Sequence, residues 1–229
     1  MKGLLLFLGA FFAMSTAHAG PLNWNDFSHT VGISITKQGG STTCSGILVA
    51  PKVVLTAAHC IEGLKEAWVT TGRKITDRPR VRSVDTRTHP GYRGNLPGGS
   101  VDLGLIFLAR PLLERLVPTP VMEVQEALTF ERIGFGGRDG QNVRTWIVSF
   151  YDGRFGDYVR ARDELGVLGD SGGPVFQRGP TGLGLVGVHT GREIGPSGAL
   201  TNVSFIQPLA AKEWAWVTET LRTTRPPQS

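Results

Sequence analysis

The chain has 229 residues, which is enough for one large domain or for two small halves packed together. Apolar residues make up 40% of it and charged residues 19%, ordinary values for a soluble globular protein, while 31 glycines favour a turn-rich β fold over a helical bundle. The net charge is +5. The densest basic stretch, Arg73 to Arg87, also contains Asp77 and Asp85 and has no interleaved aromatic residues. We therefore interpret it as solvated surface and exclude a nucleic-acid partner.

The first nineteen residues have the pattern of a secretory signal. Lys2 supplies a positive charge, Leu4 to Phe12 form a short apolar core, and the small residues around His18 fit cleavage after Ala19, which would leave Gly20 as the mature N-terminus. About nine apolar residues are too few to span a bilayer, and no later segment is long enough. The sequence therefore predicts a secreted or periplasmic protein with no membrane attachment once the signal is removed.

Short apolar runs separated by Gly, Pro, Asn and Asp follow the signal. Val31 to Ile35 alternate between apolar and small or polar residues, as a strand with one buried face does. Runs this short and this regularly interrupted favour a β-sandwich or barrel over βαβ units. Seven more strands are predicted, at Gly46 to Leu55, Trp68 to Thr71, Leu103 to Leu108, Arg132 to Phe135, Thr145 to Phe150, Gly184 to His189 and Leu200 to Phe205.

One segment, Pro208 to Thr220, has a helical pattern, with Leu209, Trp216 and Val217 at helical spacing. Pro111 to Pro120 contains three prolines and is the best candidate for a connection between two β halves.

The two cysteines, Cys44 and Cys60, predict a disulfide, because an exported protein meets an oxidising compartment. A metal site is a poor alternative, since the two thiols and His59 give only three ligands without a zinc-type C-x-x-C spacing. We therefore expect neither a metal nor an organic cofactor.

The strongest local motif is Gly169-Asp170-Ser171-Gly172-Gly173-Pro174. A serine flanked by glycines can lie on a tight turn with its hydroxyl exposed, where backbone N–H groups stabilise the oxyanion of an acyl-transfer reaction. The alternatives are a glycine-rich hairpin turn and the nucleophile elbow of α/β-hydrolases, in which an acid and then a histidine follow the serine. His189 is the only histidine after Ser171 and no acidic residue separates them, so the elbow is excluded.

The opposite chain order supplies both partners that such a serine needs. His59 lies in Thr56-Ala57-Ala58-His59-Cys60, and Asp102 stands at the head of the apolar run Val101 to Leu108. A histidine, with its ordinary pKa of about 6.5, can take the serine proton and return it to the leaving group. A buried aspartate holds the imidazole tautomer and stabilises the imidazolium.

These three segments, in this order, resemble the trypsin/chymotrypsin family of serine proteases, which shows T-A-A-H-C, D-[IL]-A-L-[IL] and G-D-S-G-G-P. Further matches extend the similarity over essentially the whole mature chain: Cys44 to Leu48, His89 to Tyr92, Ile133 to Gly136, and Lys212 to Leu221, which is similar to the family's C-terminal helix.

The resemblance implies an all-β fold of two antiparallel six-stranded barrels and a C-terminal helix. The cleft between the barrels would hold a triad of His59, Asp102 and Ser171, and the N–H groups of Gly169 and Ser171 would form the oxyanion hole. The expected divisions are an N-terminal barrel at about 20–117, a C-terminal barrel at about 118–222 and a frayed tail at 223–229.

The expected activity is that of a serine endopeptidase, a monomer acting on protein or peptide substrates through an acyl-enzyme, with a protein inhibitor as a further partner. Two alternatives remain: an esterase on the same scaffold, and an exported binding protein that has lost activity. Asn202-Val203-Ser204 matches a glycosylation sequon, which matters only in a host that modifies such sites.

Activation departs from the family pattern. In the animal enzymes, cleavage after a basic residue frees an amine that pairs with the aspartate before the serine, yet residues 20–36 contain no Lys or Arg. We therefore predict no trypsin-cleaved zymogen. A buried unpaired carboxylate is costly, so Asp170 needs a partner, either the Gly20 amine or another donor.

Specificity departs as well. Leu165 stands where trypsin-like members carry the aspartate that binds Arg or Lys, and Asp163 and Glu164 would matter only if the alignment shifted by one or two residues. Leu165 is followed by Gly166, Val167 and Leu168, so the pocket would have an aliphatic floor. Such a pocket excludes Arg and Lys and admits a small or medium apolar residue at P1, the substrate residue on the acyl side of the cleaved bond.

The segment that ends in His189, Thr190 and Gly191 supports a different specificity. It resembles the part of bacterial glutamyl endopeptidases in which a histidine contacts the acidic substrate side chain. Glutamyl specificity through His189 is therefore the alternative, and a histidine hydrogen-bonded to its neighbours is the plainer interpretation.

Overall fold

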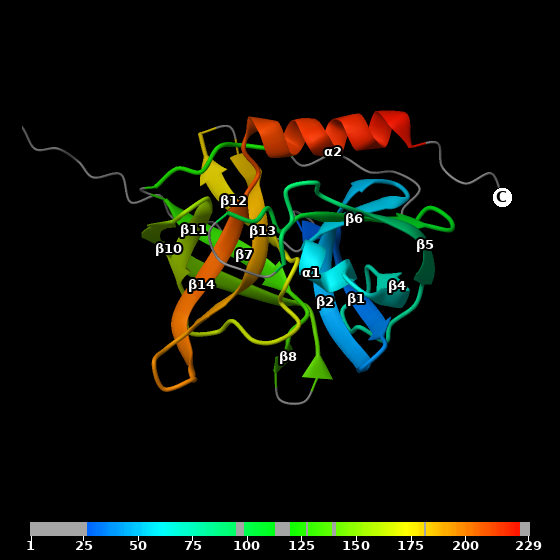
Figure 1. Ribbon diagram of the computed structural model, residues 1–229, viewed down its shortest axis with the longest axis horizontal. Helices are drawn as coiled ribbons and strands as arrows, with labels where there is room; N and C mark the ends of the chain where they lie inside the picture. Colours follow the sequence, from blue (N-terminus) through cyan, green and yellow to red (C-terminus); the bar gives the residue numbers. More distant parts are fainter. Residues whose placement is uncertain are drawn as a thin grey trace, which may run out of the picture.

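The computed structural model describes residues 27–94, 99–112, 120–126, 128–138, 141–180 and 182–224, which form two closed six-stranded barrels lying side by side (Figure 1). Each pair of neighbouring barrel strands is antiparallel. The predicted all-β architecture is thus confirmed. The predicted signal at residues 1–19, the terminus at Gly20 and most of the predicted connection between the halves lie outside the described residues.

The first barrel has the strand order β1-β2-β3-β6-β5-β4. The predicted strand Gly46 to Leu55 is in fact two strands, because Pro51 has no N–H to donate to a ladder and begins the turn between them. The barrel consists of β1 (Thr30–Lys37), β2 (Gly40–Ala50), β3 (Val53–Thr56), β4 (Leu64–Thr70), β5 (Arg80–Thr88) and β6 (Gly104–Leu108).

The second barrel has the order β10-β11-β14-β13-β12-β7. Its strands are β7 (Thr129–Gly134), β10 (Thr145–Phe155), β11 (Tyr158–Arg162), β12 (Pro174–Gly179), β13 (Gly182–Ile194) and β14 (Leu200–Pro208). The strands β8 (Gly137–Arg138) and β9 (Gln141–Asn142) pair with each other in a separate two-stranded sheet.

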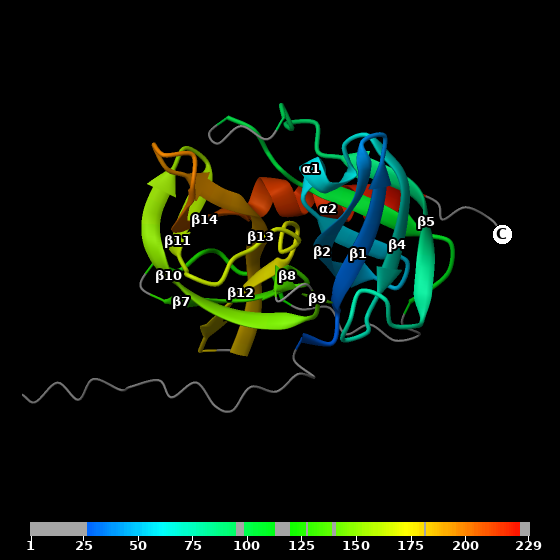
Figure 2. The ribbon, with the colours of Figure 1, turned by 90° about the horizontal axis from the view of Figure 1, so that it is seen from below.

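Two helices accompany the barrels. The four-residue α1 (Ala58–Ile61) follows β3 and carries His59, and α2 (Ala211–Thr223) extends from the second barrel across to the first (Figures 1 and 2). The predicted helix began too early: Pro208 still pairs with Gly187 as the last residue of β14, so the helix starts three residues later and ends at Thr223. No helix among the described residues is long and apolar enough to cross a membrane.

One hydrophobic cluster holds the two barrels together. It contains the inward side chains of the first barrel together with Ile133, Phe176 and Leu185 of the second. The rings of Phe27 and Phe176 pack edge-on with 5.3 Å between their centroids. Val217 of α2 is fully buried in the same cluster, so the helix is anchored as well. The cleft is therefore bounded by two bodies that share a core.

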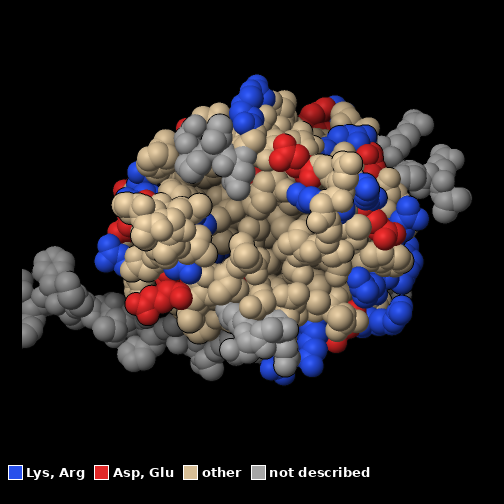
Figure 3. Space-filling model, turned by 60° about the horizontal axis from the view of Figure 1, so that its bottom comes forward, with Lys and Arg blue, Asp and Glu red and all other residues tan. Residues whose placement is uncertain are grey.

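Charged side chains lie around the rim of the face in Figure 3, where Lys and Arg are interleaved with Asp and Glu around a hollowed, uncharged centre. Arg82 contacts Glu66 and Arg87 contacts Asp85 within the predicted basic stretch. This distribution agrees with the interpretation of that stretch as solvated surface.

The predicted disulfide joins Cys44 of β2 to Cys60 of α1, with 6.3 Å between their Cα atoms. It ties the helix that carries His59 to the wall of the first barrel. The sulfur atoms of both cysteines lie within 4.8 Å of a ring nitrogen of His59, but they are bonded to each other and so are not available as thiolate ligands.

Replacing both cysteines by alanine is expected to lower the free energy of unfolding by about 3 kcal/mol, because the bond closes a loop of 16 residues in the unfolded chain. Urea denaturation of the double variant and of the oxidised protein measures the difference. Equal unfolding midpoints with equal m-values would contradict this account.

Candidate functional site

His59 and Asp102 meet at the edge of the first barrel. The Nδ1 atom of His59 lies 2.7 Å from Oδ2 of Asp102, and the backbone N–H of His59 donates to Oδ1 at 2.9 Å. The carboxylate is completely buried, whereas the imidazole keeps 18% of its side chain exposed. These two contacts favour the tautomer with its proton on Nδ1, which leaves Nε2 free to accept a proton.

The second barrel helps to hold this carboxylate. The side-chain oxygen of Gln207, on β14, accepts the backbone N–H of Asp102 at 3.2 Å, and both residues are buried. Sequence reasoning missed Gln207. The available signal was a glutamine directly after the apolar pair Phe205-Ile206, a position that a polar side chain occupies only when it has partners.

Ser171 lies on the turn that precedes β12, and Ser45 of the first barrel makes two hydrogen bonds to this turn and a third to Phe135, the residue after β7. The Ser45 N–H donates to the carbonyl of Ser171 at 2.7 Å. The Ser45 hydroxyl donates to the carbonyl of Gly169 at 2.8 Å and accepts the N–H of Phe135 at 2.8 Å. Ser45 is fully buried. The sequence marked it only as part of the family match at Cys44 to Leu48, with no role of its own.

The Ser171 hydroxyl donates to the carbonyl of Thr190 at 3.4 Å. Among the described residues, no hydrogen bond joins it to His59. Rotation about the Cα–Cβ bond of Ser171 is therefore required before its proton can reach Nε2. Hydrogen bonds of this kind are often formed only when a substrate is bound.

Gly169 gives the turn a shape that no other residue allows. Its φ is +101°, and a Cβ at this position would lie 3.0 Å from the Cα of Gly136. The N–H groups of Gly169 and Ser171, the two predicted oxyanion donors, have no acceptor within the part of the chain that the structure describes. Both are thus available to a substrate oxygen.

Asp170 is fully buried behind this turn. Its Oδ1 accepts the N–H of Gly136 at 2.9 Å, and its Oδ2 accepts the N–H of Val167 at 3.0 Å. Among the described residues, backbone amides are therefore two of its partners. The other candidate, the amine of Gly20, lies outside the described residues.

The predicted aliphatic pocket differs from the structure. The Leu165 side chain is 56% exposed, so it does not form a buried floor. The N–H groups of Leu165 and Gly166 instead donate to Oδ1 of Asp163 at 3.0 and 2.6 Å. Asp163 also pairs with the buried Arg132 at 2.8 Å, so an ion pair occupies the space that the sequence assigned to apolar groups.

His189 is buried in β13, with 2% of it exposed, and its Nε2 lies 3.3 Å from the hydroxyl of Ser204. That hydroxyl donates to Asp163 at 2.7 Å, so His189 belongs to a buried polar chain. Burial lowers the pKa of His189 well below its usual value, and the positive charge of Arg132 adds to the effect. The imidazole is therefore neutral near pH 7.

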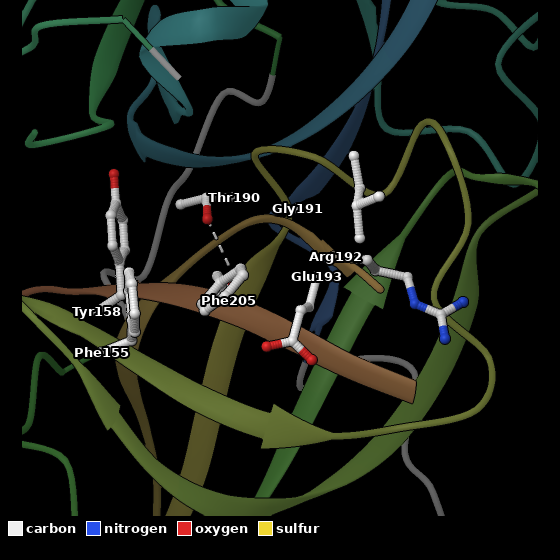
Figure 4. A pocket seen from close by; sticks show the side chains of 8 residues that line it. Phe155, Tyr158, Thr190, Gly191, Arg192, Glu193 and Phe205 are labelled. Atoms are coloured by element: carbon white, nitrogen blue, oxygen red, sulfur yellow. Dashed lines mark hydrogen bonds between the residues drawn. The ribbon is translucent and has the colours of Figure 1, made fainter. Parts of the chain in front are cut away.

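A cavity of about 390 Å³ opens beside the carbonyl that binds Ser171 (Figure 4). Phe155 and Tyr158 form one side of it, while Arg192 extends away from these rings. Of its lining, the sequence predicted Thr190 and Gly191 and missed the others, which come from four strands: Phe155, Tyr158, Arg192, Glu193, Ile194 and Phe205.

Comparisons with known proteins find similarity to proteases over most of the chain. A family model described as Trypsin matches residues 21–215. A trypsin-like protease of Streptomyces glaucescens is 28% identical over 231 aligned positions, covering 83% of this chain and 82% of that protein. Glucanase inhibitor protein 4 of Phytophthora infestans is 32% identical over 117 positions, covering 48% of this chain and 45% of the inhibitor, less than half its length.

The fold is similar to that of the thermostable serine protease AL20 from an extremophilic microorganism. The TM-score is 0.68, at 16% identity, and the match covers 87% of this chain and 99% of that one. At this identity the likeness concerns the fold alone.

Replacing Ser45 by alanine is expected to lower the free energy of unfolding by about 2–4 kcal/mol, because the Gly169 carbonyl and the Phe135 amide lose a buried partner. Urea denaturation measures the loss. Ser34→Ala, on the neighbouring strand β1, is the control and should cost less than about 0.5 kcal/mol. Equal losses in the two variants would show that the Ser45 hydroxyl does not tie the barrels.

The depressed pKa of His189 makes stability depend on pH. In the unfolded chain His189 binds a proton with a pKa near 6.5, whereas in the folded chain its pKa is well below that value. The free energy of unfolding should therefore fall as the pH drops below 6.5, by up to about 1.4 kcal/mol per pH unit. Unfolding of the wild type and of His189→Gln at pH 7.5, 6.5 and 5.5 checks this, and the variant should have the flatter profile. Parallel profiles would contradict it.

Proposed function

Because this chain belongs to the trypsin family of serine endopeptidases, we propose that it hydrolyses peptide bonds through an acyl-enzyme on Ser171, with His59 as the base and Asp102 as its orienting carboxylate. The observation that supports this most directly is the double contact of Asp102 with His59, at Nδ1 and at the backbone N–H. That contact fixes both the ring and its tautomer.

The proposed reaction begins when the Ser171 hydroxyl turns from Thr190 toward His59. The oxygen of Ser171 attacks the substrate carbonyl while its proton passes to Nε2 of His59. The carbonyl oxygen takes up negative charge, which the N–H groups of Gly169 and Ser171 stabilise. His59 then gives its proton to the leaving amine, and a water molecule releases the acyl group by the same steps.

We also propose that Arg and Lys are excluded at P1. A Cβ placed on Gly166 would lie 3.0 Å from a guanidinium nitrogen of Arg132 and 3.2 Å from Cδ of Arg192. A cationic substrate side chain would therefore approach two positive charges, against the single carboxylate of Asp163. Repulsion of this kind opposes its entry.

Export is part of the proposal. The pattern of residues 1–19, the disulfide and the absence of a membrane-spanning helix among the described residues all favour a secreted or periplasmic enzyme.

A catalytically silent binding protein is the second candidate. Its support is the similarity to two proteins named glucanase inhibitors in Phytophthora infestans, at 32% and 30% identity over 48% and 42% of this chain. The complete set of His59, Asp102 and Ser171, with Asp102 already in contact with His59, favours the enzyme.

Labelling with a fluorophosphonate probe separates the two candidates. The enzyme should carry one adduct on Ser171, mapped by peptide mass spectrometry. Ser171→Ala should carry none, and Asp102→Asn should lower kcat by about 10⁴-fold because its amide favours the wrong tautomer. Ser149→Ala, a buried serine of β10, is the control and should label normally.

No adduct on the folded wild type would favour the binding protein. An adduct on a serine other than Ser171 would contradict the proposed nucleophile.

A further inference from the structure

Arg192 lies close to the reacting serine. It is two residues beyond Thr190 on β13, and the Thr190 carbonyl accepts the hydroxyl of Ser171. Two residues of a strand span about 7 Å, which is within reach of a substrate side chain whose carbonyl is held at Ser171.

The Arg192 side chain bridges two segments. Its Nη1 donates to the carbonyl of Gly166 at 2.6 Å, on the segment that leads to the nucleophile, and its Nη2 donates to the carbonyl of Thr201. It extends away from the aromatic side of the cavity (Figure 4). The guanidinium therefore stands between Gly166 and β14, where the P1 side chain is expected.

The charge of Arg192 is unmatched. Its acceptors are two neutral carbonyls, its buried Nε has no partner, and it forms no ion pair with any described residue. The nearby acids are already engaged: Glu193 contacts Arg160 at 3.5 Å, and Asp163 pairs with Arg132. A half-buried guanidinium without an anion is costly, and a carboxylate would compensate it.

A second observation agrees on the sign of the local field. The positive charges of Arg132 and Arg192 both contribute to lowering the pKa of His189, so the buried wall behind Gly166 is electropositive. His189 itself is neutral and bonded to Ser204, which makes Arg192 the better candidate for binding an anion.

We propose that Arg192 is the specificity-determining residue of the cleft and that the preferred substrates carry glutamate or aspartate at P1. The carboxylate replaces the Gly166 and Thr201 carbonyls as the partner of the guanidinium, in a bidentate contact. This inference rests on the proposed function, because it requires a substrate acyl group on Ser171. It replaces the apolar P1 preference expected from Leu165.

The test compares two peptides that differ only at P1, Glu against the neutral isostere Gln. The kcat/KM ratio of Glu to Gln should be about 10–100 in the wild type, which is the range expected for a hydrogen-bonded ion pair. In Arg192→Gln the ratio should fall to about 1, mainly through loss of the Glu substrate.

Arg154→Gln is the matched control, since Arg154 is an exposed arginine of β10 that already pairs with Glu126. It should keep the wild-type ratio. His189→Gln should keep most of the ratio as well. Labelling of Ser171 by the fluorophosphonate probe, which requires no P1 side chain, is measured on every variant.

Three outcomes would overturn the inference. In the first, the labelled wild type does not prefer Glu, and Arg192→Ala speeds cleavage after large apolar residues, so the arginine is a plug. In the second, the Glu preference survives in Arg192→Gln and is lost in His189→Gln, so the histidine binds the acid. In the third, the wild type is not labelled, and the proposed function fails with the inference.

Discussion

The hydrogen bonds of Ser45 are the constraint on which the rest of the site depends. The turn that carries Ser171, the proposed nucleophile, belongs to the second barrel, while His59 and Asp102 belong to the first. The proposed reaction therefore requires the barrels to keep one relative position. Ser45 fixes that position by binding the carbonyls of Gly169 and Ser171 and the amide of Phe135. Burial makes each of these bonds costly to break.

Buried carboxylates shape the remaining segments. Asp102 accepts the backbone amide and ring of His59, Asp170 accepts the amides of Gly136 and Val167, and Asp163 accepts an amide pair and a guanidinium. A carboxylate loses its hydration on burial and needs several donors in return. Each of the three therefore forces a nearby stretch of backbone to converge on it. These three buried acids organise the site, but only Asp102 contacts His59, the proposed catalytic base.

The sequence predicted the parts of the fold that depend on local pattern. The apolar alternation predicted β1 and the apolar run predicted β6. The motifs around His59, Asp102 and Ser171 could be recognised because their residue types and their order along the chain are visible in the sequence. The strand β5 was missed because only Val81 among its residues is buried, so its charged residues resembled a loop. The helix boundary was wrong because pairing of Pro208 with Gly187 across the sheet overrides the local helical spacing.

The contacts around the expected pocket were less predictable than the pairing of His59 with Asp102, because no motif marks the distant residues that make them. Arg132 and Asp163 are 31 positions apart and no sequence pattern links them, yet both are buried in one ion pair. Arg192 reaches Gly166 across 26 positions through its guanidinium, and no sequence pattern marks such a contact. Leu165 matched the family position of the pocket floor, but its side chain is exposed. Its backbone N–H is bound instead, by the carboxylate of Asp163.

The central claim is that contacts between the barrels hold the Ser171 turn ready for an acyl oxyanion. A crystal structure of the phosphonylated protein tests it most directly. The account predicts the phosphonyl oxygen within about 2.7–3.1 Å of the amide nitrogens of Gly169 and Ser171, with both hydroxyl bonds of Ser45 intact. A phosphonyl oxygen turned away from these two amides, or a turn released from Ser45, would contradict it.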